Sequence, residues 1–344
     1  MFSNIKPQEA AVCKFVLWDL FVVLASILLL AGCAKKNAVP SENKTQKVKV
    51  VATIFPLYDW AKNIALGSEN IEVELLIKNG VDLHSFQPST ADIVKMLSAD
   101  VLIYVGGESD FWIEDALKNS VNKNMTLINL MNELSDSVKE EEVVDGMTEK
   151  NESHALELAE HSHDEVEYDE HLWLSVKNAQ SAAEKIARAL KVKDTEEASL
   201  IERNEIKYLE MLGQLLHDGE SLSQKSQGKK TIIVCDRFPF RYMTDELGMK
   251  YYAAFVGCSA ETEASFETIA FLSSKIKELG AKKVFVTESS DKKIARTVIK
   301  NAGLAEDECK IVTLDSMQST TLADAKAGRN YIDTMKENYQ KLSE

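Results

Sequence analysis

Short apolar segments of strand length alternate with amphipathic, helix-like segments from residue 48 to the end of the chain. In the first half the apolar segments are residues 48–54 (VKVVATI), 71–77 (IEVELLI), 101–106 (VLIYVG) and 125–130 (MTLINL). The segments between them carry helix signals, such as Pro56 for a first turn and Ser89 or Thr90 for a cap. This alternation predicts a mainly parallel sheet that is covered on both faces.

The same alternation returns in the second half, after a long helical stretch. Residues 175–192 form an amphipathic helical pattern, and residues 195–224 continue without a proline, which suffices for a helix of about 45 Å. The later apolar segments are residues 231–236, 249–256, 282–288 and 309–316. We therefore predict an α/β fold of two similar lobes, each with a mainly parallel four-stranded sheet, linked by a long rigid helix. A ligand site is expected in the cleft between the lobes, at the carboxyl ends of the strands.

The N-terminus has the pattern of an export signal. Residues 15–30 are apolar except for Asp19, basic residues precede them, and the sequence LAGC follows at 30–33. This ending resembles a bacterial lipobox, which implies that Cys33 is lipidated; a plain signal peptide with an incidental cysteine is the alternative. Residues 34–46 are polar and read as a flexible tether. We expect an extracytoplasmic protein, lipid-anchored to a bacterial cell membrane without spanning it.

Charge and cysteine usage exclude some classes of partner and of site. The net charge of -15 argues against nucleic acid as a partner and suits a cationic solute. The cysteines that follow the leader show no paired spacing, so neither a disulfide scaffold nor a Cys-rich zinc motif is indicated. The predicted organisation is a leader (1–32), a tether (33–47), an N-terminal lobe (48–194) with an acidic loop (about 133–170), a linking helix (195–227) and a C-terminal lobe (228–344).

Histidines stand in three kinds of setting. His154, His161 and His163 lie in the acidic loop, where they are either weak cation collectors or plain solvated residues. His217, on the long helical stretch, is expected at the surface. His171 differs because it lies in DEHLWLS, at the boundary with a helix and beside apolar residues.

Two other polar residues follow predicted strands. His84 lies in GVDLHSFQPSTAD after the second strand, and Glu288 ends the strand KKVFVTE. Ligands of open α/β sheets collect at the carboxyl ends of strands. A structural histidine and a helix-capping carboxylate are the respective alternatives, so these positions by themselves leave a binding role open.

Four motifs in order give the chain a family resemblance. HSFQPSTAD resembles a His-Ser-Phe-Glu-Pro-Ser motif, DEHLWLS an Asp-Pro-His-Ile-Trp-Leu-Ser motif, Glu288 a late carboxylate ligand, and GRNYIDTM a final-helix signature. These are features of the cluster A-I substrate-binding lipoproteins of bacterial zinc and manganese ABC transporters. The resemblance implies a metal held between the lobes by His84, His171 and Glu288, and an ABC permease as the partner.

The chain departs from that family at one ligand. Where the family has His or Glu before a Phe-x-Tyr element, this chain has CDRFPFRYM, which places Arg237 at the ligand position. Arginine has no acceptor for a cation, so we expect it to pair with an acidic group of the opposite lobe. Asp236 is the preferred replacement ligand; the alternatives are Cys235, which strand alternation would more readily bury, Glu261 or Glu263, or a water in a site with three protein ligands.

Two imidazoles with two carboxylates suit Zn²⁺, whereas Mn²⁺ or Fe²⁺ would also accept this rather hard set. In zinc-binding members of the family a His-rich mobile loop precedes the second histidine, and residues 152–167 occupy that place, which favours zinc. We predict a monomeric protein, not an enzyme, that captures Zn²⁺ and delivers it to the permease. The alternatives are a manganese or iron carrier, an extracytoplasmic zinc hydrolase, for which HExxH and nucleophile-elbow signatures are lacking, and an adhesin.

Overall fold

The protein is described from a computed structural model that covers residues 47–118, 120, 122–147, 167–226, 230–259 and 263–343. The leader and tether with Cys33, the loop histidines His154, His161 and His163, and Glu261 lie outside these described residues. Residues Gln46–Glu344 form one compact unit. In the part of the chain that the structure describes, no helix is both long and apolar enough to cross a membrane.

The first sheet is parallel and has the strand order β2-β1-β3-β4. Its strands are β1 (Val48–Ala52), β2 (Ile71–Leu75), β3 (Val101–Tyr104) and β4 (Thr126–Asn129). Alternate residues of β1 face opposite sides, so Val50 and Ala52 join the main core while Val51 joins a smaller core. We call this sheet and its helices, residues 47–193, the N-terminal lobe.

The second sheet is also parallel, with the order β10-β9-β7-β8. Its strands are β7 (Thr231–Phe238), β8 (Lys250–Val256), β9 (Lys283–Val286) and β10 (Lys310–Thr313). The pairing of β7 with β8 shifts register between Val234 and Arg237. We call residues 230–327 the C-terminal lobe. The predicted α/β fold with two parallel four-stranded sheets is confirmed.

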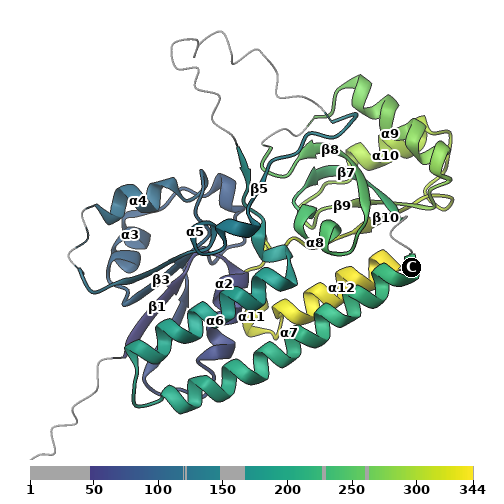
Figure 1. Ribbon diagram of the computed structural model, residues 1–344. Helices are drawn as coiled ribbons and strands as arrows, with labels where there is room; N and C mark the ends of the chain where they lie inside the picture. The colour runs from purple at the N-terminus through teal and green to yellow at the C-terminus, as the bar shows by residue number, and fades with distance from the viewer. Residues whose placement is uncertain are drawn as a thin grey trace, which may run out of the picture. The chain divides into compact units, whose positions relative to one another are not determined.

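Helices cover both faces of each sheet, and the long helix α7 runs beneath both lobes (Figure 1). The 29-residue α7 (Ala198–Ser226) spans roughly 44 Å, and α12 (Tyr331–Ser343) lies beside it. The other helices are α2 (Phe55–Ile64), α3 (Thr90–Leu97), α4 (Phe111–Leu117), α5 (Leu130–Glu133), α6 (Val176–Lys193), α8 (Arg241–Glu246), α9 (Phe266–Leu279), α10 (Lys293–Asn301) and α11 (Leu322–Lys326). One core cluster contains residues of both sheets together with α6, α7 and α12, so the long helix is packed into the body of the molecule. His217 on α7 is exposed, as expected.

The two ends of the acidic loop meet in an element that the sequence did not reveal. Strand β5 (Lys139–Glu140) pairs antiparallel with β6 (Tyr168–Asp169). A short 3-10 turn, η4 (Leu172–Leu174), follows. Trp173 Nε1 donates to the Ser316 carbonyl at 2.9 Å, which ties this segment to the C-terminal lobe.

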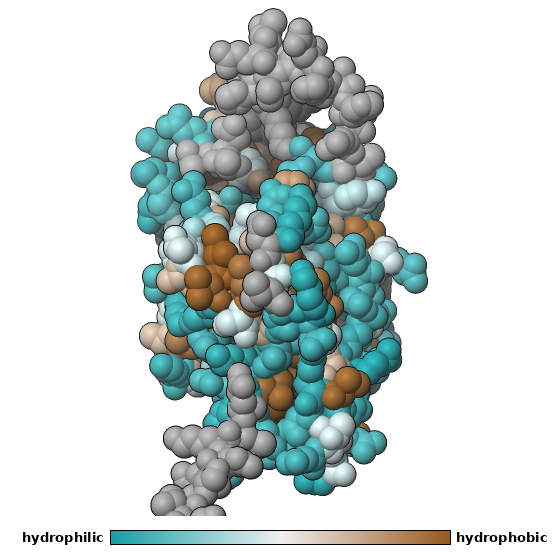
Figure 2. Space-filling view, turned by 90° about the vertical axis from the view of Figure 1, so that its left-hand side faces the viewer, coloured by the Kyte–Doolittle hydropathy of each residue, from teal (hydrophilic) through white to brown (hydrophobic). Residues whose placement is uncertain are grey.

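The outer surface matches the acidic composition. Figure 2 shows the side of the molecule on which α3 and α4 lie as mainly hydrophilic, with separate apolar patches. Val94 and Phe111 are among the large apolar side chains that are exposed. Scattered exposed apolar side chains are normal for a protein in water, so this face gives no reason to place the functional site there.

Candidate metal centre

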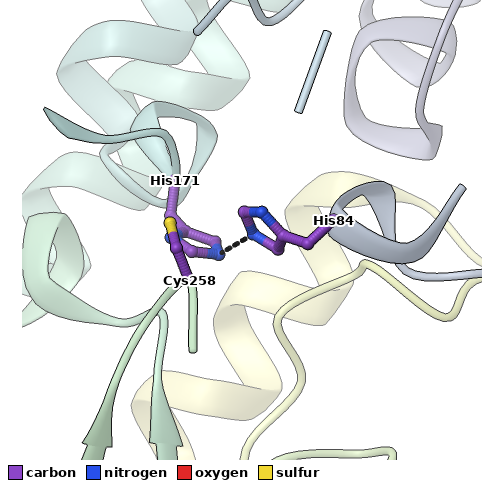
Figure 3. A group of neighbouring side chains, drawn as sticks. All are labelled: His84, His171 and Cys258. Atoms are coloured by element: carbon purple, nitrogen blue, oxygen red, sulfur yellow. Dashed lines mark hydrogen bonds between the residues drawn. The ribbon is translucent and has the colours of Figure 1, made fainter. Parts of the chain in front are cut away.

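Three residues with metal-ligating atoms converge between the lobes. One ligand atom each of His84, His171 and Cys258 lies within 4.8 Å of the other two (Figure 3). His84 comes from the 3-10 turn η1 (Leu83–Ser85), His171 directly precedes η4, and Cys258 follows β8. Two of the four ligands predicted from the sequence, His84 and His171, are thus brought together.

The turn that carries His84 fixes the direction of its ring. Asp82 accepts the backbone N–H of His84 at 3.0 Å and so caps the turn. The imidazole Nδ1 lies 2.6 Å from Ser109 Oγ and 3.8 Å from Glu170 Oε2. Burial, and then the neighbouring His171 ring, lower the pKa of His84 to about 4. His84 is therefore neutral at neutral pH and presents Nε2 toward His171.

The ring of His171 is fully buried and is held by a carboxylate. Asp169 Oδ1 accepts both the backbone N–H of His171, at 2.9 Å, and its Nδ1–H, at 2.8 Å. A carboxylate on Nδ1 fixes the tautomer that leaves Nε2 with a free lone pair, an arrangement common behind metal-bound histidines. The Nε2 atom faces the other imidazole, as Figure 3 shows.

The distance between the two rings suits a cation. The two Nε2 atoms are 3.3 Å apart. Two nitrogens bound tetrahedrally to Zn²⁺ at about 2.0–2.1 Å would lie about 3.3–3.4 Å apart. Two lone pairs that face each other at this distance repel unless a proton or a cation lies between them. The two imidazoles therefore have the geometry of two ligands of one metal ion.

Glu288 lies close by but is engaged with its own lobe. Its carboxylate accepts the backbone N–H and the hydroxyl of Ser316, both at 2.8 Å, and the backbone N–H groups of Gln318 and Ser319 at 3.2 and 3.4 Å. Burial, and then the charge of Asp315, raise the pKa of Glu288. Gln318 connects Glu288 to the imidazoles, because its backbone N–H donates to the Glu288 carboxylate and its side-chain Nε2 lies 3.3 Å from His171 Nε2.

Glu288 also lines a cavity between the lobes. This interlobe cavity measures about 170 Å³ and includes Asp82 from one lobe and Arg237 and Gln318 from the other. Arg237 donates to Asp82 at 2.8 Å across the two lobes. The structure thus bears out the expectation that Arg237 pairs with an acidic group of the opposite lobe. Burial raises the pKa of Asp82, but the charge of Arg237, together with the hydrogen bonds from Arg237 and from the backbone N–H of His84, outweighs burial and holds this pKa below its usual value.

Asp236 is not brought to the imidazoles. One of its carboxylate oxygens accepts the backbone N–H and the hydroxyl of Thr287, at 3.3 and 2.9 Å, and the other accepts the N–H of Arg237 at 2.8 Å. It lies at the register shift of β7 and lines a different pocket from His84. Cys235 is buried in the apolar core of the C-terminal lobe, as strand alternation predicts, and Glu263 is exposed.

Cys258 is not among the ligands predicted from the sequence, although it lies a few residues before Glu261 and Glu263, two of the predicted alternatives. The cysteine sits directly after a strand end, which was an available signal. Burial, and then the carboxylates of Glu141 and Asp169, raise the pKa of its thiol. It lines a second cavity of about 260 Å³, here called the acidic cavity, with His84, Glu108, Ser109, Glu141, Glu167, Tyr168 and Glu170.

Comparison with known proteins gives this site a context. Residues 50–344 match the profile of a family described as zinc-uptake complex component A, periplasmic. The zinc-binding protein AdcA of Streptococcus pyogenes serotype M18 (strain MGAS8232) is 29% identical over 300 residues, which are 86% of this chain and 55% of AdcA. The high-affinity zinc uptake system protein ZnuA of Bacillus subtilis (strain 168) is 27% identical over 332 residues, 96% of this chain and 98% of ZnuA.

Solved structures agree in fold. The crystal structure of Zn(II)-bound AdcA from Streptococcus pneumoniae superposes with a TM-score of 0.64 at 26% identity, over 86% of this chain and 57% of that one. The chain thus spans only about half the length of the AdcA proteins that it matches.

Proposed function

Because residues 50–344 match it, the chain belongs to the family of periplasmic zinc-uptake component A proteins, and we propose that it captures Zn²⁺ outside the cytoplasm and delivers it to an ABC permease. The observation that carries this proposal is the pair of imidazoles, that of His171 fully buried and that of His84 partly buried, whose Nε2 atoms are 3.3 Å apart. In the proposed organisation Cys33 carries the lipid that anchors a monomer to the membrane. The protein acts as a carrier rather than an enzyme.

His84 and His171 are the proposed core ligands, and Glu288 and Asp236 are the carboxylates that the sequence indicates for the remaining positions. Glu288 Oε2 accepts the Ser316 N–H, and a carboxylate oxygen has a second lone pair with which it can bind a cation. Asp236 would have to turn away from Thr287 to reach the same ion. The metal would therefore rest mainly on the imidazoles and Glu288.

Zinc is preferred over manganese because neutral imidazole nitrogens are softer donors than carboxylates. The names of the AdcA and ZnuA relatives support the same ion. A manganese carrier of the same transporter class is the second candidate, because Glu288 and Asp236 would offer that ion hard oxygen donors.

The test combines elemental analysis of the purified protein with thermal unfolding. A ligand that binds only the folded state raises the unfolding midpoint, so Zn²⁺ should raise it, a chelator should lower it, and Mn²⁺ at equal free concentration should raise it less. The double variant His84→Ala, His171→Ala should lose the response, whereas His217→Ala, with its ring exposed on α7, should keep it. A larger rise with Mn²⁺ contradicts the zinc assignment, and no rise with either ion contradicts a metal carrier.

A further inference from the structure

The thiol of Cys258 stands apart from the other described cysteines. Cys235 and Cys309 are packed in the apolar core of the C-terminal lobe. Cys258 is only partly buried, faces the acidic cavity and lies with His84 and His171 in one group of potential ligands. A core-packing role, which accounts for the other two cysteines, does not account for this one.

The backbone beside Cys258 is built to approach His171. A Cβ atom at Gly257 would lie 2.9 Å from the Phe238 carbonyl oxygen and 3.0 Å from Cε1 of the His171 ring. Only glycine therefore allows the loop after β8 to come this close. The N–H of Cys258 donates to Glu141 Oε1 at 3.0 Å, which fixes the loop from the side of the N-terminal lobe.

From this placement we infer that Cys258, rather than Asp236, supplies the further protein ligand, as a thiolate, so that the metal is held by two imidazoles, one sulfur and the Glu288 carboxylate. The inference rests on the proposed function. When Zn²⁺ binds, the S–H bond breaks, a Zn–S bond forms and the proton leaves to solvent. The ligand that the family resemblance implies at position 237, and that Arg237 cannot supply, is then replaced from a different strand end.

For the two imidazoles and the sulfur, the required movement is small. Sulfur and nitrogen bound to one tetrahedral Zn²⁺, at about 2.3 and 2.0–2.1 Å, lie about 3.5 Å apart. The ligand atoms of the group already lie within 4.8 Å of one another, so rotation of the cysteine side chain and a slight shift of the loop suffice. Asp236 would instead have to give up its bonds to Thr287.

A thiolate also changes selectivity. Sulfur ligands favour Zn²⁺ strongly over Mn²⁺, which prefers oxygen donors. Cys258 would thus make the site more selective for zinc than two imidazoles and two carboxylates would be.

The test uses the purified protein, kept reduced and loaded with Zn²⁺ or with Co²⁺ as a spectroscopic substitute. Zinc-edge X-ray absorption of the wild type should show a scatterer at about 2.3 Å in addition to shorter nitrogen and oxygen ligands, and the Co²⁺ form should show thiolate-to-metal charge-transfer absorption. Both signals should be absent in Cys258→Ser and Cys258→Ala and kept in the control Cys309→Ala. Zinc affinity of the Cys258 variants should fall about 10-fold or more, against a smaller change for Mn²⁺.

The outcomes separate the two proposals. A wild type that binds Zn²⁺ with nitrogen and oxygen ligands alone overturns the assignment of Cys258 and leaves the proposed function standing. Loss of the sulfur signal in Asp236→Ala with retention in Cys258→Ala would also overturn it. A wild type that binds neither ion contradicts the proposed function itself. Circular dichroism of each variant shows whether it is folded, and the two different Cys258 substitutions guard against a defect of one of them.

Discussion

The two lobes prepare their sides of the site in different ways. In the N-terminal lobe, each imidazole is held through Nδ1, His84 by Ser109 and His171 by Asp169, and the two Nε2 atoms face each other. In the C-terminal lobe, the carboxylates of Glu288 and Asp236 point into hydrogen bonds of their own lobe. The first half of the site is ready for a cation, whereas the second half has to share or exchange partners.

This difference between the lobes indicates which ligands should contribute most to metal affinity. A preorganised ligand loses little conformational freedom and few hydrogen bonds when it binds. A carboxylate that already accepts several N–H groups gains less from a cation, because part of its charge is already neutralised by hydrogen bonds. We therefore expect metal affinity to depend more on the imidazoles and their supports than on the carboxylates of the opposite lobe.

The largest effect should follow removal of an imidazole. We predict that His171→Ala lowers zinc affinity more than 100-fold, beyond the range seen when an outer residue is lost, and that Glu288→Gln lowers it less. Competition titration with a zinc chelator dye measures both. His217→Ala is the control, since its ring is exposed on α7. A greater loss of zinc affinity in Glu288→Gln than in His171→Ala would show that the carboxylate of the C-terminal lobe contributes more to affinity than the imidazole of the N-terminal lobe.

The next effect concerns the support of His171. Asp169→Asn places an amide that cannot serve equally well as acceptor for Nδ1–H, so zinc affinity should fall about 10- to 100-fold. Asp110→Asn is a matched control, because Asp110 is also a buried carboxyl group of the N-terminal lobe, but it accepts the N–H groups of Val105 and Gly106. Equal affinities of the two variants would show that the orientation of His171 does not depend on Asp169.

A smaller effect is expected from the ion pair across the cleft. Arg237→Ala removes the contact with Asp82 between the lobes, but partly exposed ion pairs contribute only about 0–1 kcal/mol. Zinc affinity should change by less than about fivefold, which is about 1 kcal/mol, and the coordination number should be unchanged. Arg296→Ala, which removes an exposed pair with Glu306, is the charge-matched control. A changed coordination number in the X-ray absorption spectrum of Arg237→Ala would contradict this prediction, because it would show that Arg237 affects the ligands of the metal directly.

The last effect should leave the site untouched and act on stability alone. Burial raises the pKa of Asp110 to about 7, so the folded state holds its proton more tightly than the unfolded chain does. The resulting stability is complete below about pH 4 and is lost as pH rises toward 7. The melting temperature of metal-free wild type should therefore fall by several degrees relative to Asp110→Asn between pH 4.5 and 7.5. Melting temperatures that change equally with pH in the two proteins would contradict the raised pKa of Asp110.

Much of the fold follows from local patterns. The eight strands of the two parallel sheets begin within one residue of their predicted positions, and five of them end two or three residues before the apolar runs do, because those runs also include buried residues of the following turn. The β5–β6 pair was missed because two-residue strands carry no periodicity. His84 and His171 could be selected because each stands at an element boundary within a motif.

The sequence by itself determined the two parallel sheets, the long helix and the histidines available for a site, because buried strands and helices can be recognised from short-range apolar periodicity. Only the tertiary structure decided which donor atoms meet. Side chains reverse direction at every residue of a strand, and the register shift in β7 turns Asp236 toward Thr287. Gly257 lets a distant strand end bring Cys258 against a ring 87 residues away from it in sequence. Such convergence depends on packing between the lobes, which no local pattern encodes.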